Sequence, residues 1–275
     1  MTWLADDAVA RLRKIADEPD FSGTRYRLKN EIARGGMGAV YEAEDFELGR
    51  SVAVKVLATH EARVIAKLEH PGIVPVHDAG TLPDGRVFYV MKLVRGRTLA
   101  ATDPLRLFLR VCEAVAFAHS RGVIHCDLKP SNVMVGEFGE VLVMDWGVAK
   151  PVGAAAIGGT RGFMPPEQER GEPLDPTADV FALGCMLRLM ATEPMPRRLA
   201  AVIAKCTAED RRNRYPSARE LATDIAHFID GEPVSAHREN VFERAGRWLD
   251  RNRAVVALIL GYLVMRAIVL LVARR

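Results

Sequence analysis

The chain has 275 residues, 49% hydrophobic and 27% charged, which is an ordinary composition for a globular protein with a large core. Its formal net charge of +3 at pH 7 is too small to indicate a nucleic-acid-binding protein. The four cysteines form no C-x-x-C pair and the seven histidines show no ligand spacing, which argues against a zinc site.

Residues 1–25 contain no long apolar run, so a signal peptide is not expected. Their mixture of charged and apolar residues predicts a short amphipathic helical extension that packs on the following domain or on a partner.

The next segment predicts three strands. Residues 32–44, IARGGMGAVYEAE, have the pattern of strand, glycine turn and strand, and 51–57, SVAVKVL, indicate a third strand. Gly35, Gly36 and Gly38 would let backbone N–H groups approach phosphates, although an ordinary hairpin turn is the alternative. Lys55 favours the phosphate site, because a lysine inside an apolar strand is costly to bury unless it meets an anion.

Lys55 requires a carboxylate partner, and Glu61 is the candidate. It follows Lys55 by only six positions, so its helix is expected to begin near Thr59, which can act as the N-cap. The alternative for Glu61 is a solvated charge on a helix face. Residues 71–94 then predict two more strands joined by a Leu-Pro-Asp-Gly turn.

The most informative stretches are 123–135, VIHCDLKPSNVMV, and 143–147, VMDWG, which follow a predicted helix over 105–122. They contain Asp127, Lys129, Asn132 and Asp145. Phosphoryl transfer needs an acid to orient the attacking hydroxyl, a lysine for the moving phosphate, and amide and carboxylate oxygens for Mg²⁺. These residue types at this spacing therefore predict a phosphoryl-transfer site.

Taken in order, these motifs resemble the eukaryotic-type (Hanks-type) protein kinases over residues 26–230. Lysine two positions after Asp127 is typical of serine/threonine kinases, and GGMGAVYEAE, DWGVAK and RYPSARELATDI are similar to bacterial membrane-anchored members. The resemblance implies an α+β bilobal kinase fold with a small β-rich N-lobe, 26–93, and a helical C-lobe, 94–230. It also implies an ATP- and Mg²⁺-dependent transferase that phosphorylates serine and threonine in protein substrates.

The resemblance also implies a role for each site residue. The catalytic set is Asp127, Lys129, Lys55, Glu61 and Thr160. The nucleotide-binding set is Gly35, Gly36, Gly38, Val40, Ala53, Lys55, Met91, Lys92, Val94 and Met134, with Met91 as gatekeeper. Asn132 and Asp145 would bind Mg²⁺. For each apolar residue taken alone, an ordinary core position is the simpler interpretation.

Later motifs extend the resemblance. In 158–168, GGTRGFMPPEQ, Thr160 is expected to contact Asp127 and Lys129, and Glu167 to pair with Arg214. Asp179 is expected to steady the catalytic loop, with a simple helix-start carboxylate as the alternative. His125 is expected to be structural.

Several features depart from the family pattern. Ala33 replaces the first glycine of the loop, and only 191–196 stand where relatives have another helix. With the short connection before Glu61, this leaves open a pseudokinase scaffold that binds nucleotide without efficient transfer. A small-molecule kinase is disfavoured by the peptide-shelf motifs.

The activation segment, 148–159, contains no Ser, Thr or Tyr, and Cys126 stands where many relatives have arginine. The pair formed by that arginine and a phosphate on the segment is therefore excluded. Activity is expected not to depend on phosphorylation of this segment.

The C-terminal part predicts a membrane anchor. Residues 231–253 indicate a polar, Arg-rich juxtamembrane linker, and 254–273 are apolar except for Arg266. Twenty helical residues span roughly 30 Å, which predicts a transmembrane helix; a buried or interfacial helix is the alternative. The preceding arginines predict a single-pass inner-membrane protein with a cytoplasmic kinase domain. Homodimer formation is left open.

Overall fold

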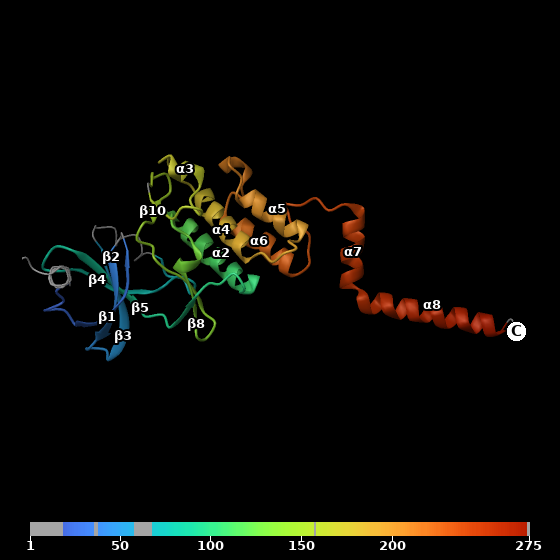
Figure 1. Cartoon of the computed structure of the whole chain (residues 1–275), viewed down its shortest axis with the longest axis horizontal. Coiled ribbons are helices and arrows are strands. Elements are labelled where there is room, and N and C mark those ends of the chain that lie inside the picture. Colours follow the sequence, from blue (N-terminus) through green and yellow to red (C-terminus); the bar gives the residue numbers. More distant parts are fainter. Residues whose placement is uncertain (1–18, 36–37, 58–67, 157, 274–275) are drawn as a thin grey trace, which may run out of the picture.

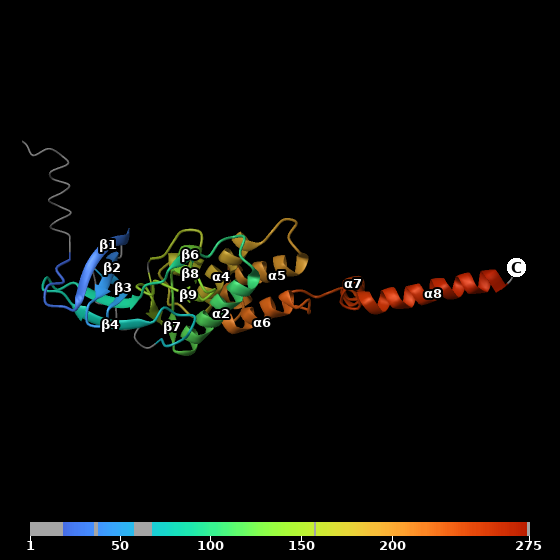
Figure 2. The same ribbon diagram turned by 90° about the horizontal axis from the view of Figure 1, so that it is seen from below.

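The structure is a computed structural model that describes residues 19–35, 38–57, 68–156 and 158–273. Figure 1 shows a lobe of strands at one end, a helical lobe beside it, and two C-terminal helices that extend away from both. The view turned by 90° shows the same separation of the two lobes and the same extended C-terminal helix (Figure 2).

The N-lobe is a five-stranded antiparallel sheet with strand order β1-β2-β3-β5-β4. Its strands are β1 (Tyr26–Gly35), β2 (Gly38–Asp45), β3 (Arg50–Leu57), β4 (Val76–Thr81) and β5 (Val87–Lys92). These are the five strands that the sequence predicts, and β3, with Val52, Val54 and Val56, has the clearest β-branched pattern.

Alternation along β3 divides its side chains between the two faces of the sheet. Val52, Val54 and Val56 belong to the core on one face, while Ala53 and Leu57 join the large core on the other. Lys55 has the same parity as Ala53, so the sheet directs it toward the C-lobe.

The C-lobe contains the remaining elements of the domain. They are β6 (Gly96–Thr98), α2 (Leu105–Ser120), β7 (Val123–Ile124), η3 (Pro130–Asn132), β8 (Val133–Gly136), β9 (Val141–Val143), β10 (Lys150–Pro151), α3 (Pro166–Glu169), α4 (Thr177–Met190), α5 (Arg197–Cys206), η4 (Arg211–Asn213) and α6 (Ala218–Ile229). Strands β6, β8 and β9 form a small sheet, and β10 pairs with β7.

Helix α2 organises the C-lobe core. Its residues Phe108, Val111, Val115 and Ala118 recur at three- and four-residue spacing and are fully buried. They join residues of α4, α5 and α6 in one core. The bilobal α+β fold that the motifs imply is therefore present. Residues 191–196 join α4 to α5 without an intervening helix, as their length predicts.

A helix lies within residues 231–253, the segment that the sequence predicts to be a polar, Arg-rich linker. Helix α7 (Val241–Arg251) begins at a capping box, in which the Asn240 side chain accepts from the Glu243 N–H at 2.8 Å. The Glu243 carboxylate in turn accepts from the Asn240 N–H at 3.1 Å. Because this exchange satisfies two N–H groups that a helix start leaves without partners, it favours a helix within a polar segment.

Helix α8 (Arg253–Ala273) coincides with the predicted apolar helix. Within the described residues, however, no helix reaches the combination of length and apolar character that a membrane crossing requires. The prediction of a membrane-spanning segment at 254–273 is therefore wrong for the described residues. Residues 1–18, Gly36, and the expected helix near Thr59 with Glu61 lie outside the described residues.

Candidate active site

The lysine of β3 meets the aspartate that follows β9. Lys55 is 4% exposed, and its Nζ forms an ion pair with Oδ1 of Asp145. A Cβ on Gly147 would lie 3.1 Å from that Nζ and 3.3 Å from that Oδ1, so glycine leaves room for the pair. Asp145 has a φ of 57°, which is a left-handed backbone conformation that residues other than glycine rarely adopt.

This pairing controls the ionisation of Asp145. Burial is the largest single influence on Asp145 and opposes its ionisation, but the charge of Lys55 and its hydrogen bond outweigh burial, so the pKa of Asp145 lies below its ordinary value. Asp145 is therefore a carboxylate at neutral pH, the form that a Mg²⁺ ligand requires.

The catalytic loop brings three predicted residues together. Oδ2 of Asp127 accepts from Lys129 Nζ at 2.8 Å, and its Oδ1 accepts from the Thr160 hydroxyl at 2.7 Å. Lys129 also donates to the Thr160 hydroxyl at 2.7 Å. The structure thus contains the triangle of contacts that the sequence predicts among these side chains.

A buried carboxylate holds the backbone of this loop. Asp179, on α4, accepts from the N–H groups of His125 at 2.8 Å and Cys126 at 3.0 Å. It also contacts Nε2 of His119, on α2, at 2.8 Å. Burial alone would raise the pKa of Asp179, but the His119 contact and the other bonds lower it below its ordinary value. The contact of Asp179 with the loop is predicted, whereas His119 has no sequence signal that separates it from an ordinary helix-end histidine.

His125 has a structural environment. It is fully buried, its Nε2 lies 2.9 Å from the Met144 carbonyl oxygen, and its Nδ1 accepts from the Asp127 N–H at 3.2 Å. Its ring lies 4.6 Å from that of Trp146. His125 therefore joins the catalytic loop to the segment that carries Asp145.

Oxygen donors suited to Mg²⁺ come from Asn132 and Asp145. The Asn132 side-chain nitrogen donates to the Asp127 carbonyl at 2.8 Å, which leaves its amide oxygen as an acceptor. The Met144 N–H donates to the Asn132 carbonyl at 2.8 Å and so sets Asp145 beside η3. Within the described ranges no three His, Cys, Asp or Glu residues cluster for a metal. This small donor set fits Mg²⁺, which protein sites commonly hold with one or two carboxylates and substrate phosphates.

Three of the predicted adenine-pocket residues, Val40, Ala53 and Met91, lie in or against the large core that also contains the C-lobe helices. Register sets Val40 opposite Lys55 and Ala53 opposite Met91. Met134 is half-buried on β8. Met144, which immediately precedes Asp145 and packs against the same core, is a further lining candidate that the motif comparison does not supply.

The predicted hinge begins at Lys92, the last residue of β5. The Lys92 N–H donates to the Pro75 carbonyl at 3.1 Å, and Lys92 Nζ pairs with Glu140 at 3.3 Å. The Lys92 side chain therefore contacts the turn between β8 and β9. Val94 is partly buried against the core.

The glycine turn has a structural requirement of its own. Gly35 pairs with Gly38 across β1 and β2. A Cβ on Gly38 would lie 2.0 Å from the Val56 carbonyl oxygen, and its φ is 128°. Gly38 is thus needed where β2 approaches β3, whether or not a phosphate is bound.

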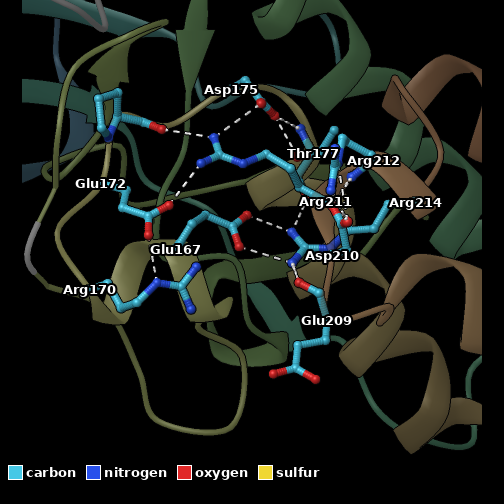
Figure 3. A network of polar contacts seen from close by, with 11 residues as sticks. Glu167, Arg170, Glu172, Asp175, Thr177, Glu209, Asp210, Arg211, Arg212 and Arg214 are labelled. Carbon is cyan, nitrogen blue, oxygen red and sulfur yellow. Dashed lines mark hydrogen bonds and ion pairs between the residues drawn. The ribbon is translucent and has the colours of Figure 1, made fainter.

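Figure 3 shows the network of polar contacts that contains Glu167 and Arg214. Arg214 donates to both carboxylate oxygens of Glu167, at 2.5 and 2.9 Å, and both side chains are almost completely buried. Arg214 also donates to the carbonyl oxygens of Ala208 at 2.7 Å and Thr177 at 3.1 Å. The predicted pair of Glu167 and Arg214 is present, and it satisfies a guanidinium that would otherwise be costly to bury.

A second arginine binds the same segment. Arg211 donates to Glu172 at 2.8 Å, to the Pro173 carbonyl at 3.0 Å and to Asp175 at 3.4 Å (Figure 3). The sequence motifs do not single out Arg211. It fastens the segment after α3 to η4.

Comparison with known proteins agrees with this geometry. A model described as protein kinase domain matches residues 26–231. The chain is 32% identical over 283 residues to a probable serine/threonine-protein kinase of Streptomyces coelicolor, covering 80% of this chain and 42% of the relative. It is also 32% identical over 281 residues to serine/threonine-protein kinase PknB of Mycobacterium tuberculosis, covering 79% of this chain and 45% of the relative.

The chain thus spans less than half the length of these curated relatives. The family match itself covers most of the chain, including both lobes and every described residue of the site. The chain therefore belongs to the protein kinase family, and its kinase domain is of the bacterial serine/threonine class of transferases.

Proposed function

We propose that this chain is an ATP- and Mg²⁺-dependent protein kinase that transfers the γ-phosphoryl group to serine or threonine hydroxyls of proteins in membrane-associated signalling. The observation that carries the proposal is the hydrogen bond from the Thr160 hydroxyl to Asp127 at 2.7 Å. Lys129 donates a hydrogen bond to each of these two side chains. Asp127 thus accepts a hydroxyl hydrogen bond, which is what orienting a substrate hydroxyl requires.

Each residue then has a distinct task. Asp127 orients the attacking hydroxyl, and Lys129 stabilises charge on the phosphoryl group as it moves. Lys55 positions the α and β phosphates, and Glu61 is its proposed second partner. Asn132 and Asp145 would hold Mg²⁺, which supplies positive charge that offsets the charge of the phosphates.

The nucleotide site would be completed by the strands above the cleft. The backbone of Gly35, Gly36 and Gly38 covers the phosphates. Val40, Ala53, Met91 and Met134 enclose the adenine between the lobes, and the backbone of Lys92 to Val94 bonds its edge.

Labelled ATP provides the direct test. The purified chain should autophosphorylate and phosphorylate generic protein substrates, but not small alcohols, when supplied with [γ-³²P]ATP and Mg²⁺. Asp127→Asn and Lys55→Met should abolish transfer, because positioning and charge stabilisation supply nearly all of the catalysis. Asp127→Asn should still bind nucleotide, since the proposed role of Asp127 is toward the hydroxyl.

A nucleotide-binding scaffold gives a different result. The absence of a helix between α4 and α5 is the observation that favours it. Nucleotide binding without any transfer by the unmodified chain would support the scaffold and overturn the kinase proposal.

We further propose that α8 associates the kinase with a membrane. Leu258, Leu263 and Leu270 are 74, 52 and 57% exposed, and the apolar residues between them are exposed on every side of the helix. Arg266 is the one charged residue between Leu258 and Leu270. A helix whose exposed surface is otherwise apolar on every side favours an apolar environment, and a partner protein with a single docking face would cover only part of it. Figures 1 and 2 show α8 extending away from the catalytic lobes.

Liposome flotation tests this association. The full chain should float with vesicles of phosphatidylethanolamine and phosphatidylglycerol, and the Leu258→Glu/Leu263→Glu variant should stay at the bottom of the gradient. Leu48→Glu, which alters an exposed leucine of the N-lobe, is the matched control and should float. A full chain that fails to float would contradict the proposal, and alkaline carbonate extraction would grade how firmly a floating chain is held.

A further inference from the structure

We infer that Gln168 is a positioning residue for phosphoryl transfer, and that its side-chain amide holds the catalytic loop and residues 158–160 in register. The inference rests on the proposed kinase function, which it extends to a residue outside the predicted site. Gln168 lies on α3 directly after Glu167, whose place in the network Figure 3 shows.

One nitrogen atom joins two separate segments. Gln168 Nε2 donates to the Cys126 carbonyl at 2.7 Å and also to the Gly158 carbonyl. A primary amide has two N–H hydrogens, so both are used. The side chain is only 2% exposed, and buried hydrogen bonds of this kind have no water to replace them.

The two carbonyls flank the reactive contact. Cys126 immediately precedes Asp127, and Gly158 is two positions before Thr160, the residue whose hydroxyl donates to Asp127. The amide therefore fixes, from outside the cleft, the backbones that carry the two partners of that contact. Asp179 holds the N–H of Cys126 at 3.0 Å, so the peptide groups on both sides of this residue are restrained.

The intervening backbone is shaped around the amide. Gly159 has a φ of 136°, and a Cβ there would lie 3.0 Å from both the Cys126 oxygen and Gln168 Nε2. Any side chain at this position would push the two segments apart. Cys126 itself has a φ of 67°, another left-handed conformation that these bonds help to maintain.

The required chemistry is specific to glutamine. Two carbonyl oxygens need two donors from one side-chain end. Methionine has a similar length and shape but donates nothing. Glutamate would turn carboxylate oxygens toward two carbonyl oxygens, which is repulsive as well as unbonded. If the amide positions Asp127 and Thr160, kcat should fall in the order Gln, Met, Glu.

The test compares Gln168→Met and Gln168→Glu with the unmodified full chain, measuring kcat, KM for ATP, nucleotide affinity and thermal unfolding. The control is Glu169→Gln, which changes the neighbouring exposed residue of the same helix and should behave as the unmodified chain. Gln168→Met should lower kcat about 10- to 100-fold, the loss expected when reacting groups are misplaced by up to about 1 Å. KM for ATP and nucleotide affinity should change less than about twofold, because the amide bonds to the carbonyls of Cys126 and Gly158. Lys55 and Asp145 instead hold each other, and Asn132 bonds to Asp127.

A lower kcat with a nearly unchanged KM for ATP, and with a midpoint of thermal unfolding close to that of the unmodified chain, would support the positioning role. An unchanged kcat in a folded Gln168→Met variant would overturn it, as would a parallel loss of kcat, nucleotide affinity and thermal stability, which denotes a purely structural residue. Should Gln168→Glu not fold, Gln168→Met decides alone. An unmodified chain that binds ATP but transfers nothing would overturn the proposed function together with this inference, whereas an active chain with an equally active Gln168→Met variant would overturn this inference alone.

Discussion

At the scale of single residues, the site depends on buried charges whose hydrogen bonds are satisfied. The bidentate contact of Arg214 with Glu167 is accompanied by bonds to carbonyl oxygens of Ala208, Thr177 and Glu209. The guanidinium fork suits this arrangement, since a single ammonium cannot reach so many acceptors at once. Arg214 thus acts as a rigid joint between α3, the start of α4 and the segment before η4.

The first prediction concerns this joint. Arg214→Ala should lower the free energy of unfolding by about 3–5 kcal/mol, because it leaves the Glu167 carboxylate buried without its partner. The free energy of unfolding of Arg214→Lys should lie between those of Arg214→Ala and the unmodified chain, since lysine keeps the charge but lacks the forked guanidinium. Urea unfolding monitored by circular dichroism measures both. Arg212→Ala is the control, since Arg212 is exposed and pairs only at the surface with Asp210, and it should leave stability unchanged. An Arg214→Ala variant as stable as this control would refute the assignment.

At the scale of elements, the activation segment is held by backbone pairing and apolar contacts. Strand β10 pairs with β7 next to the catalytic loop. Ala156 is buried in a small cluster with Ile124, Cys126, Leu174 and Ala178. Burial also raises the pKa of the Cys126 thiol far above its ordinary value, so this side chain is a neutral part of the cluster. The position at which many relatives have a phosphate-binding arginine, Cys126, is therefore part of an apolar cluster in this chain.

The second prediction follows from that substitution. Treating the purified kinase with phosphatase should leave its initial rate unchanged, because the segment from Val148 to Gly159 has no hydroxyl to modify and no arginine at position 126 to bind a phosphate. The rate before and after treatment, with a phosphorylated control protein to verify the phosphatase, is the measurement. A large loss that preincubation with ATP restores, with a phosphosite mapped to 148–160, would show that the segment is controlled by phosphorylation after all.

At the scale of the whole molecule, several buried or partly buried carboxylates share one dependence on pH. The four concerned, each with a pKa below its ordinary value, are Asp145, Asp175, Asp179 and Asp224. In each case burial opposes ionisation, and hydrogen bonds or positive charge outweigh it. Asp145 lies beside Lys55, Asp175 after α3, Asp179 against the catalytic loop and Asp224 on α6, so their protonation would weaken the domain at several places.

The third prediction gives this dependence its sign. Because the folded-state pKa values are depressed, these groups bind protons more tightly in the unfolded chain, whose aspartates titrate near about 3.9. Their stabilisation should be complete well above that pH and should be lost as pH falls through the lower folded values. Urea unfolding midpoints between pH 7 and pH 3 should therefore be level at first and then decline steeply.

Asp179→Asn offers a matched comparison. It should be less stable than the unmodified chain at pH 7, because the amide cannot replace a carboxylate that accepts from two backbone N–H groups and contacts His119. Its stability should also fall less on acidification, since one of the titrating groups is gone. An identical decline in both proteins would exclude Asp179 from the acid response.

Residues near one another in the chain could be predicted from the sequence alone. The alternating strands of the N-lobe, the apolar spacing of α2, and the motif that contains Asp127, Lys129 and Asn132 are local patterns, and each depends on neighbours a few positions away. Even the distant contacts of Thr160 and Glu167 were accessible, because the motifs that contain them occur in the order known for the family.

Only the tertiary structure decided the contacts for which no local pattern exists. The bridge from Gln168 to Cys126 and Gly158, the contact of His119 with Asp179, and the hold of Arg211 on Glu172 each join segments at least ten positions apart through a single side chain. A lone glutamine or histidine has the same local appearance on any helix, and its partner is chosen by how α2, α3 and α4 pack. The sequence motifs were therefore enough to predict which residue types the site contains. The contacts that hold those residues in place depend on packing, because hydrogen bonds between distant segments form only after the core has brought those segments together.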